Sequence, residues 1–526
     1  MRKKSLLNLF RNCLGLLLMA KLIVGCAQPS VPPVSEAGLI PLPVNVTPGE
    51  GAFSFNAKTR LVIANSDEEL LRSAKWFAGL IAPAAGFELQ IEKSDEERVS
   101  NSILFRLVDD EQLCEEGYKL QVEKQMVILE ANNPEGIFRG LQTLRQLLPA
   151  AIESATLVDQ KWYVPVCTIL DYPRFEYRGA MLDVSRHFFG VDEVKRFIDY
   201  MAAYKLNVLH LHLTDDQGWR IEIKSWPNLT VHGGQTEVGG GEGGFYTQDE
   251  FKDLVKYASD RYIAIVPEID MPGHTNAALA SYTELNESNV APDLYTGTNV
   301  GFSSLATRKE ITYQFVEDVI REISAISPCE YIHIGGDESH STKKEDYIYF
   351  MNRVQDIVAR HGKKAIGWDE IATATMQPGS VAQHWASISN AKLAVQQNAR
   401  LILSPASRIY LDMKYDSTTV LGLKWAGYTE VDKAYNWNPD TLIQGIDPSF
   451  IQGVEAPLWA ETIETLDDIE FLIFPRLPGL AEIGWTPEVD RNWDDYKNRL
   501  AKQNDWFQVM DINYYQSPLV SWSVGE

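Results

Sequence analysis

Two adjacent carboxylates, Asp337 and Glu338, are the sharpest chemical feature of the 526-residue chain. They follow a short apolar run and two glycines, Gly335 and Gly336, which let a substrate or a neighbouring backbone come close. Adjacent acids at the end of a strand repel each other, which tends to raise the pKa of one and keep it protonated. The pair therefore predicts general acid catalysis at a strand end.

Indoles and further acids end most of the other strand-like runs in the second half of the chain. An indole face stacks on the C–H face of a pyranose ring, while carboxylates and Arg bind the hydroxyls. A carboxylic acid also protonates a glycosidic oxygen, which is too poor a leaving group to depart unprotonated. Any one of these residues alone is more often a loop cap or a packed aromatic. Together they indicate a sugar ligand: Asp183, Asp215, Asp216, Glu268, Asp270, Trp368, Asp369, Glu370, Trp385, Trp459 and Glu461.

The adjacency of Asp337 and Glu338 bears on the mechanism. The acid and the nucleophile of most retaining glycosidases lie about 5–5.5 Å apart on opposite sides of the scissile bond, which suits sequence neighbours badly. A 2-acetamido sugar needs no enzymic nucleophile, because its own carbonyl oxygen attacks the anomeric carbon. The second carboxylate then orients the amide and stabilises the oxazolinium. The pair favours this substrate-assisted route, with a covalent glycosyl-enzyme as the alternative.

Alternating strands and helices must position these groups. After residue 171, strand-like runs occur at 178–184, 208–213, 263–269, 331–334, 364–368, 381–385, 401–403 and 453–459. Helical patterns lie between most of them, at 191–204, 247–261, 307–326 and 345–361. Eight such units predict a (β/α)₈ TIM barrel over 171–526, with active groups where each strand ends. The competing open doubly wound sheet lacks a Gly-rich dinucleotide turn, and the glycines of 233–244 are expected to form a flexible loop.

The segment 38–170 has a different pattern. Strands are expected at 60–64, 102–107, 118–122 and 126–130, the last two as a hairpin, and helices at 68–80 and 136–148. This predicts a small α/β domain with helices on one face of a sheet. No residue in it suggests chemistry.

The first 25 residues are typical of a secretory signal. The initiating Met and three basic residues, at 1–4, precede a short apolar run. Ile23-Val24-Gly25 before Cys26 resembles the lipobox of bacterial lipoproteins. A transmembrane helix is the alternative, but the run is too short and Lys21 interrupts it. A plain signal peptide cut nearby is the other. We therefore expect a signal at 1–25, lipidation of Cys26, a Pro-containing tether at 26–37 and a lipid-anchored protein of the cell envelope, at the periplasmic face of the outer membrane or the cell surface.

Composition excludes several classes. The net charge of −24 becomes −29 once 1–25, with five basic and no acidic residues, is removed, and the absence of a basic cluster argues against nucleic acid. A content of 10% aromatic residues, with 13 Trp, argues against a disordered chain. The remaining cysteines, Cys114, Cys167 and Cys329, allow at most one disulfide and lack metal-ligand spacing.

Four long motifs carry a resemblance to a known family. They lie at 183–189 (DVSRHFF), 210–220 (HLHLTDDQGWR), 267–274 (PEIDMPGH) and 333–338 (HIGGDE). In this order they resemble the β-N-acetylhexosaminidases of glycoside hydrolase family 20, over about residue 38 to the C-terminus. The resemblance implies a (β/α)₈ barrel behind a small α/β domain.

The resemblance also implies residue roles. Glu338 matches the general acid/base, and Asp337 matches the residue that orients and stabilises the acetamido nucleophile. Arg186 and Asp215 match positions that bind the 3- and 4-hydroxyls, and His274 with Asp215 matches a relay to the acid. The other matches are to the sugar-binding walls and hydroxyl ligands: Trp368, Trp385 and Trp459 around the acetamido methyl and ring, Tyr410 at the acetamido oxygen, Asp412 and Glu461 at the 6- and 4-hydroxyls, and Trp425 on the leaving-group side.

These arguments predict an exo-acting, retaining β-N-acetylhexosaminidase that removes terminal GlcNAc or GalNAc from glycans. No metal or organic cofactor is expected, because protonation and an internal nucleophile suffice. One rival is a metal-dependent barrel hydrolase, since His210 and His212 share one face of a strand. The other is a glycan-binding lipoprotein without catalysis, against which the intact acid pair argues. Membrane contact is expected only through the lipid anchor, and no oligomeric state is predicted.

Overall fold

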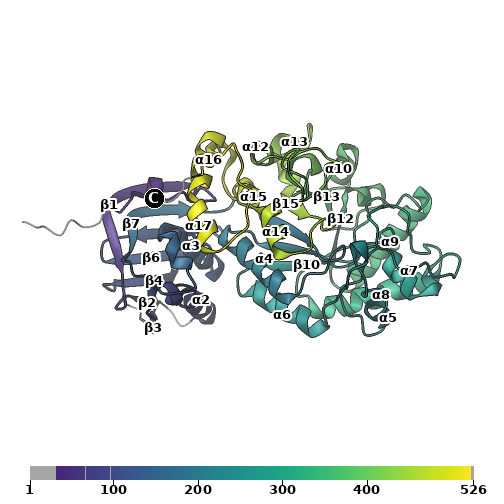
Figure 1. Ribbon diagram of the computed structural model, residues 1–526, viewed down its shortest axis with the longest axis horizontal. Helices are drawn as coiled ribbons and strands as arrows, with labels where there is room; N and C mark the ends of the chain where they lie inside the picture. The colour runs from purple at the N-terminus through teal and green to yellow at the C-terminus, as the bar shows by residue number, and fades with distance from the viewer. Residues whose placement is uncertain (1–30, 65–66, 95, 97, 523–526) are drawn as a thin grey trace, which may run out of the picture.

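The computed structural model describes residues 31–64, 67–94, 96 and 98–522. A seven-stranded sheet forms one end of the molecule and a closed barrel the other (Figure 1). Each has its own buried apolar cluster. No helix in these ranges is both long and apolar enough to span a membrane.

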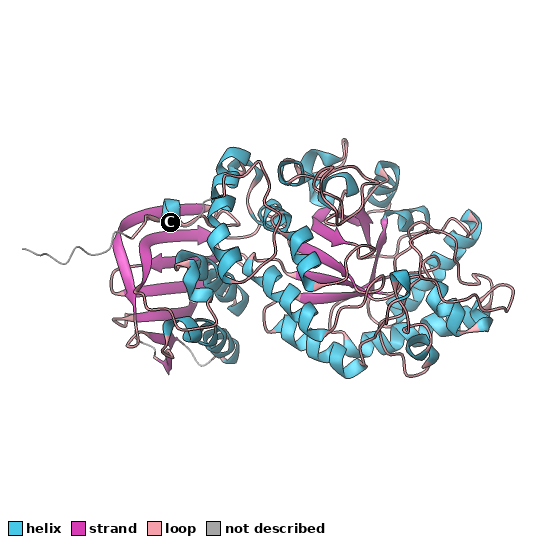
Figure 2. Cartoon of the chain, in the orientation of Figure 1, coloured by secondary structure: helices cyan, strands magenta, loops and turns pink. Residues whose placement is uncertain are grey.

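The N-terminal sheet has the strand order β1-β7-β5-β6-β4-β2-β3. The bounds are β1 (Asn45–Phe55), β2 (Arg60–Ile63), β3 (Gln90–Lys93), β4 (Ser102–Leu107), β5 (Tyr118–Val122), β6 (Met126–Ala131) and β7 (Trp162–Asp171). Helices α2 (Glu68–Ala85) and α3 (Pro134–Leu147) cover one face of this sheet (Figure 2). The expected hairpin is confirmed, since β5 pairs antiparallel with β6.

Three strands of this sheet, β1, β3 and β7, are not predicted from the sequence. The strand β1 contains a Pro and two Gly and is largely exposed, and these residues are usually depleted in strands. The strand β7 pairs with both β1 and β5, and the short β3 forms the sheet edge beside β2. Pairing with distant partners, which local sequence does not encode, produces all three.

The barrel confirms the predicted fold class. Its strands are β8 (Tyr177–Asp183), β9 (Val208–His212), β10 (Ala264–Glu268), β11 (Tyr331–His333), β12 (Lys364–Trp368), β13 (Val381–His384), β14 (Arg400–Leu403) and β15 (Ile451–Leu458). Each is parallel to the next, and β15 pairs with β8 to close the ring. All eight coincide with the expected runs to within two residues at each end, so the carboxyl ends of the strands meet at one mouth.

Amphipathic helices surround the barrel. The helix α6 (Gln248–Ser259) begins at a capping box, in which Thr247 and Glu250 bond reciprocally, and it buries one apolar stripe. Helices α4, α8 and α9 occupy the other expected positions. The remaining bounds are α4 (Val191–Ala203), α5 (Asn228–Val231), α7 (Asn276–Ser281), α8 (Glu310–Ile326), α9 (Lys344–Arg360), α10 (Ile388–Gln396), α11 (Ala406–Ile409), α12 (Val431–Tyr435), α13 (Pro439–Leu442), α14 (Leu466–Ile473), α15 (Arg476–Trp485), α16 (Trp493–Lys502) and α17 (Asn504–Val509).

Polar contacts join the two domains. Glu116 pairs with Arg178 at the start of the barrel and with Arg139 of α3, all three buried. Burial opposes the charge of Glu116, but the two guanidinium groups lower its pKa to about 2. The helix α16 adds a further link, because Arg499 donates to the carbonyl of Leu39 at 2.8 Å. In the part of the chain that the structure describes, the three cysteines are free thiols.

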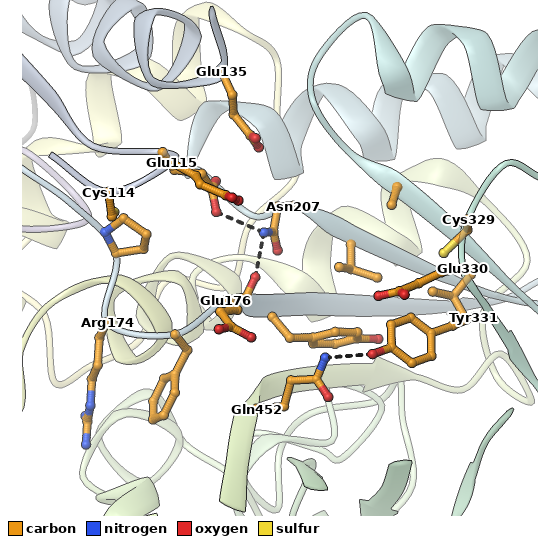
Figure 3. Close-up of a pocket in the computed structure, with 17 residues that line it drawn as sticks. Cys114, Glu115, Glu135, Arg174, Glu176, Asn207, Cys329, Glu330, Tyr331 and Gln452 are labelled. Atoms are coloured by element: carbon orange, nitrogen blue, oxygen red, sulfur yellow. Dashed lines mark hydrogen bonds between the residues drawn. The ribbon is translucent and has the colours of Figure 1, made fainter. Parts of the chain in front are cut away.

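One large cavity lies away from the mouth. It encloses about 620 Å³ between the N-terminal domain and the barrel floor, and Figure 3 shows Glu115 and Glu135 facing Glu330 and Tyr331 across it. Its barrel side is formed by the first residues of strands, including Tyr177 of β8. This end of a TIM barrel serves stability rather than chemistry. The cavity is therefore not the active site.

Candidate active site

The acid pair stands on a strained turn after β11. Gly335 and Gly336 have φ of 60° and 104°, and a Cβ on Gly335 would lie 1.7 Å from Asp270 Oδ1. Only glycine fits there. Glu338 itself has φ of 44°, a conformation that costs a non-glycine residue energy and that clusters at functional sites. The turn aims both carboxylates into the barrel mouth.

The two acids have different surroundings. Asp337 is buried and its Oδ1 has no hydrogen-bond partner among the described residues, whereas the Glu338 side chain is 29% exposed. Burial and then the neighbouring Asp270 raise the pKa of Asp337 well above its usual range. The sequence argument assigns the raised pKa to the general acid. In the structure, the carboxyl with the raised pKa is Asp337, which matches the orienting role, and burial is the largest cause.

A row of charged side chains leads from the pair into the barrel, and hydrogen bonds join its inner members. His274 Nε2 lies 3.6 Å from Asp337 Oδ2 and 3.7 Å from Glu338 Oε2. On its other side, His274 Nδ1 lies 3.1 Å from Asp215 Oδ1, and Asp215 Oδ2 lies 3.1 Å from His212 Nε2. The Asp215–His274 half of the relay implied by the resemblance is hydrogen-bonded, whereas His274 Nε2 approaches the acid pair without a hydrogen bond within the described residues.

Charge complementarity polarises this chain. Burial opposes ionisation of Asp215, but Arg186 and then His274 lower the pKa of Asp215 well below its usual range. Burial likewise opposes the cationic form of His274, yet the charges of Asp215 and Asp337 raise the pKa of His274 well above its usual range. The cationic form of His274 is therefore favoured behind the acid pair.

Four of the predicted sugar ligands form a polar cluster beside the pair. Arg186 Nη2 lies 2.7 Å from Asp215 Oδ2, and its guanidinium lies 4.7 Å from the centre of the Trp459 ring. Burial raises the pKa of both Asp412 and Glu461, and the charge of Glu461 raises that of Asp412 further. Buried atoms of these side chains find no hydrogen-bond partner within the described ranges: Arg186 Nε, both oxygens of Asp412 and Glu461 Oε2.

The predicted aromatic residues form a continuous wall. Ring centres of Trp368 and Trp459 lie 5.6 Å apart, and Tyr410 lies 6.4 Å from Trp459. Trp385 stacks on Tyr410 at 6.5 Å, and Trp425 lies 6.0 Å from Trp385. Trp425 is 56% exposed and stands at the rim. The structure thus gathers every predicted site residue except Cys26, which lies outside the described residues.

The histidines of the metal-site rival are engaged within the barrel. His210 Nδ1 lies 2.9 Å from Glu455, and its Nε2 lies 2.9 Å from Glu268. His212 contacts Glu268 and Asp215 through its two nitrogens. Although burial opposes it, these carboxylates raise the pKa of His210 to about 9 and that of His212 well above its usual range. A ligating imidazole must be neutral, so the raised pKa values of His210 and His212 disfavour a metal ion at this pair.

Two supporting residues have no specific role in the sequence arguments. Glu268 accepts from the indole N–H of Trp368 at 2.9 Å, which ties a wall residue to the His212 end of the relay. Tyr347 of α9 donates to the carbonyl of Gly336 at 2.8 Å. The position of Glu268 at a strand end is a signal in the sequence, whereas nothing there distinguishes Tyr347 from other helical tyrosines.

The buried carboxyl of Asp270 makes the stability of the protein depend on pH. Burial, helped by the Glu268 charge, raises the pKa of Asp270 from 3.8 to about 7. The unfolded chain releases this proton at lower pH than the native protein does. The native state therefore loses stability as pH rises between those two values, and the deficit persists above about pH 7.

We expect Asp270→Asn to stabilise the protein at alkaline pH. The amide oxygen keeps an acceptor for the Gly336 N–H, which now lies 3.0 Å from Asp270 Oδ1. The variant's free energy of unfolding in urea should exceed the parent's by on the order of 3 kcal/mol at pH 8. Near pH 4 the two proteins should agree. A difference independent of pH would contradict a raised pKa at Asp270.

Comparisons with known proteins identify the family of the chain. The model described as glycosyl hydrolase family 20, catalytic domain, matches residues 175–347 and 339–488, and that described as domain 2 of the family matches 36–172. A β-N-acetylhexosaminidase of Cellulomonas fimi is 40% identical over 93% of this chain and 97% of its own length.

Solved structures are similar over nearly the whole chain. The family 20 β-N-acetylhexosaminidase of Streptomyces coelicolor A3(2) has a TM-score of 0.90 and 48% identity, covering 94% of this chain and 100% of its own. A mutant Streptomyces plicatus β-hexosaminidase in complex with its product GlcNAc has a TM-score of 0.90 and 49% identity, covering 94% and 99%. With both domain models matched and these relatives aligned end to end, the chain belongs to glycoside hydrolase family 20.

Proposed function

We propose that the protein is an exo-acting, retaining β-N-acetylhexosaminidase that hydrolyses terminal non-reducing GlcNAc or GalNAc. The observation that carries this is the set of buried, unpartnered polar atoms on Arg186, Asp337, Asp412 and Glu461 beside an indole wall, all within the described residues. An unsatisfied buried polar group costs about 1–3 kcal/mol, so several at one mouth indicate a polar ligand. A sugar ring between indoles satisfies both halves of the site.

In the first step, Glu338 donates a proton to the glycosidic oxygen while the bond to the anomeric carbon breaks. The acetamido carbonyl oxygen of the substrate attacks that carbon and forms the oxazolinium. Asp337 accepts the amide N–H, for which its Oδ1 is available. Burial raises the pKa of Asp337, but the positive charge that develops on the oxazolinium favours the ionised carboxylate, which then stabilises that cation.

In the second step, Glu338 takes a proton from water as the water oxygen attacks the anomeric carbon. The oxazolinium ring opens, which restores the 2-acetamido group of the sugar. The two displacements on opposite faces retain the anomeric configuration. The half-exposed Trp425 at the rim lies where the leaving group extends. Support from relatives is consistent, because the Streptomyces plicatus complex contains the product GlcNAc.

Hydrolysis and inhibition together test this function. We expect release of 4-methylumbelliferone from its N-acetyl-β-glucosaminide, strong competitive inhibition by a thiazoline mimic of the oxazoline, and no loss of activity with chelator. A covalent glycosyl-enzyme mechanism predicts indifference to the thiazoline. Failure to hydrolyse any aryl N-acetylhexosaminide would instead support a glycan-binding protein without catalysis.

We also propose that the protein is lipid-anchored in the cell envelope. Its basis is the signal-like segment 1–25 and the lipobox-like residues before Cys26. Val34, eight residues beyond Cys26, is buried in the core of the N-terminal domain. An anchor at Cys26 would therefore hold the N-terminal domain near the membrane, with the barrel beyond it.

Acyl labelling tests the anchor. We expect the full chain expressed in a bacterium to incorporate radiolabelled palmitate and to sediment with membranes. Cys26→Ala should lose both properties, because it removes the acylated thiol, and Cys114→Ala should keep them. Equal labelling of the Cys26→Ala variant and the parent would contradict lipidation at this residue.

A further inference from the structure

Two consecutive carboxylates that the mechanism does not use lie behind the aromatic wall. They begin the short helix η5 (Asp369–Thr373), directly after β12. Asp369 is fully buried, and its Oδ2 accepts from the backbone N–H groups of Trp385 at 3.3 Å and Ser387 at 2.9 Å. Asp369 therefore fixes the backbone of the loop that carries Trp385.

Glu370 binds the side chain of Trp385. Its Oε2 accepts from the indole Nε1–H of Trp385 at 3.1 Å. The opposite contacts of the indole are apolar: it stacks on Tyr410 and meets Trp425 edge to face. The hydrogen bond adds a directional restraint to this packing and opposes rotation of the indole about its Cβ–Cγ bond.

The position is costly for a carboxylate. Burial, and then the charge of Asp369, raise the pKa of Glu370 to about 7, and Glu338 adds to the repulsion. The phenols of Tyr347 and Tyr410 and the carboxyl of Asp337 also feel its charge. The fold therefore keeps an acid among like charges at this position, and both of its protonation states accept from the indole.

We propose that Glu370 is a positioning residue, which locks the Trp385 indole against the substrate's N-acyl group and so sets the size of the acyl pocket. The inference rests on the proposed function, because the acyl group belongs to that substrate. Trp385 fills the pocket only while its ring is held in one orientation. An indole free to rotate leaves room for a longer acyl chain.

Acyl-chain selectivity tests this role. The measurement is kcat/KM for 4-nitrophenyl β-glucosaminides carrying an N-acetyl or an N-butanoyl group, with the full-length enzyme. A methylene that does not fit a pocket costs about 10-fold or more. We expect Glu370→Ala to raise the butanoyl/acetyl ratio about tenfold, mainly through kcat/KM for the longer substrate. Glu370→Gln should keep the parental ratio, because its amide oxygen still accepts from the indole.

A double-mutant comparison separates positioning from general damage. Trp385→Phe lacks the N–H donor, so in that background Glu370→Gln and Glu370→Ala should give the same butanoyl/acetyl ratio. Glu345→Gln, an exposed acid of α9, is the matched control. Midpoints of thermal unfolding identify variants that have lost the fold. If Glu370→Ala is one of them, Glu370→Leu, which is closer to Glu in volume and has no acceptor, makes the same test.

The outcomes distinguish the two claims. A parent enzyme that hydrolyses neither substrate sinks the proposed function. A parent that hydrolyses the acetyl substrate, with a folded Glu370→Ala or Glu370→Leu variant of parental selectivity, overturns the positioning role. The positioning role would also be overturned if the Glu370 substitutions changed the butanoyl/acetyl ratio equally in the parent and in the Trp385→Phe background.

Discussion

Replacing Glu338 with Gln is expected to abolish hydrolysis of substrates with poor leaving groups. Gln cannot donate a proton to the glycosidic oxygen, and general acid catalysis contributes about 10²–10⁴-fold. For N,N′-diacetylchitobiose, kcat/KM should fall by that factor. For the 2,4-dinitrophenyl glycoside, whose leaving group departs unprotonated, kcat/KM should fall by less than about tenfold, because this parameter reports the first irreversible step.

The dependence on leaving group distinguishes acid catalysis from damage to the site. Glu345→Gln on the exposed face of α9 provides the control, with parental rates on both substrates. The side chain of Glu338 is partly exposed, so its amide analogue should not disturb folding. If Glu338→Gln hydrolysed the disaccharide at the parental rate, the assignment of the acid would be wrong.

Replacing Asp337 with Asn should slow every substrate, whatever its leaving group. The carboxylate both fixes the acetamido group and stabilises the positive charge of the oxazolinium, and loss of such a group costs about 10²–10³-fold in kcat. Asn can still form hydrogen bonds, but it carries no charge. We therefore expect kcat to fall by about two to three orders of magnitude for disaccharide and dinitrophenyl glycoside alike.

The uniformity of this loss is what separates Asp337 from Glu338. Asp249→Asn, at an exposed acid of α6, is the matched control. The variant should also bind the thiazoline inhibitor more weakly, because the charge that stabilises the cation is gone. A loss confined to poor leaving groups would exchange the assigned roles of the two acids.

The barrel strands could be predicted because the local sequence of each one is enough to indicate a buried strand. A parallel strand buried on both faces is a short apolar run, and most of the runs here end in a polar or aromatic residue. A closed barrel then brings residues as distant as Arg186 and Trp459 to the same mouth, where the guanidinium lies over the indole. For these residues, membership of the site followed from their place at a strand end.

The contacts between site residues could not be predicted in the same way. The hydrogen bond between Trp385 and Glu370 joins two loops, and its partners are ordinary in sequence. The raised pKa of Asp337 depends on burial and on Asp270 from the neighbouring strand end, neither of which adjacency to Glu338 reveals. The strands β1 and β7 likewise depend on pairing across the sheet. Each of these properties comes from tertiary structure.

The most direct test of the account is the response to fluorine in the acetamido group. Attack by the substrate's own carbonyl oxygen weakens as fluorine withdraws electrons from it, whereas an enzymic nucleophile is indifferent to this change. For 4-methylumbelliferyl glucosaminides with N-acetyl, N-monofluoroacetyl, N-difluoroacetyl and N-trifluoroacetyl groups, we predict that kcat/KM falls steeply with each fluorine. A kcat/KM that is flat across the series would contradict substrate-assisted catalysis by this protein.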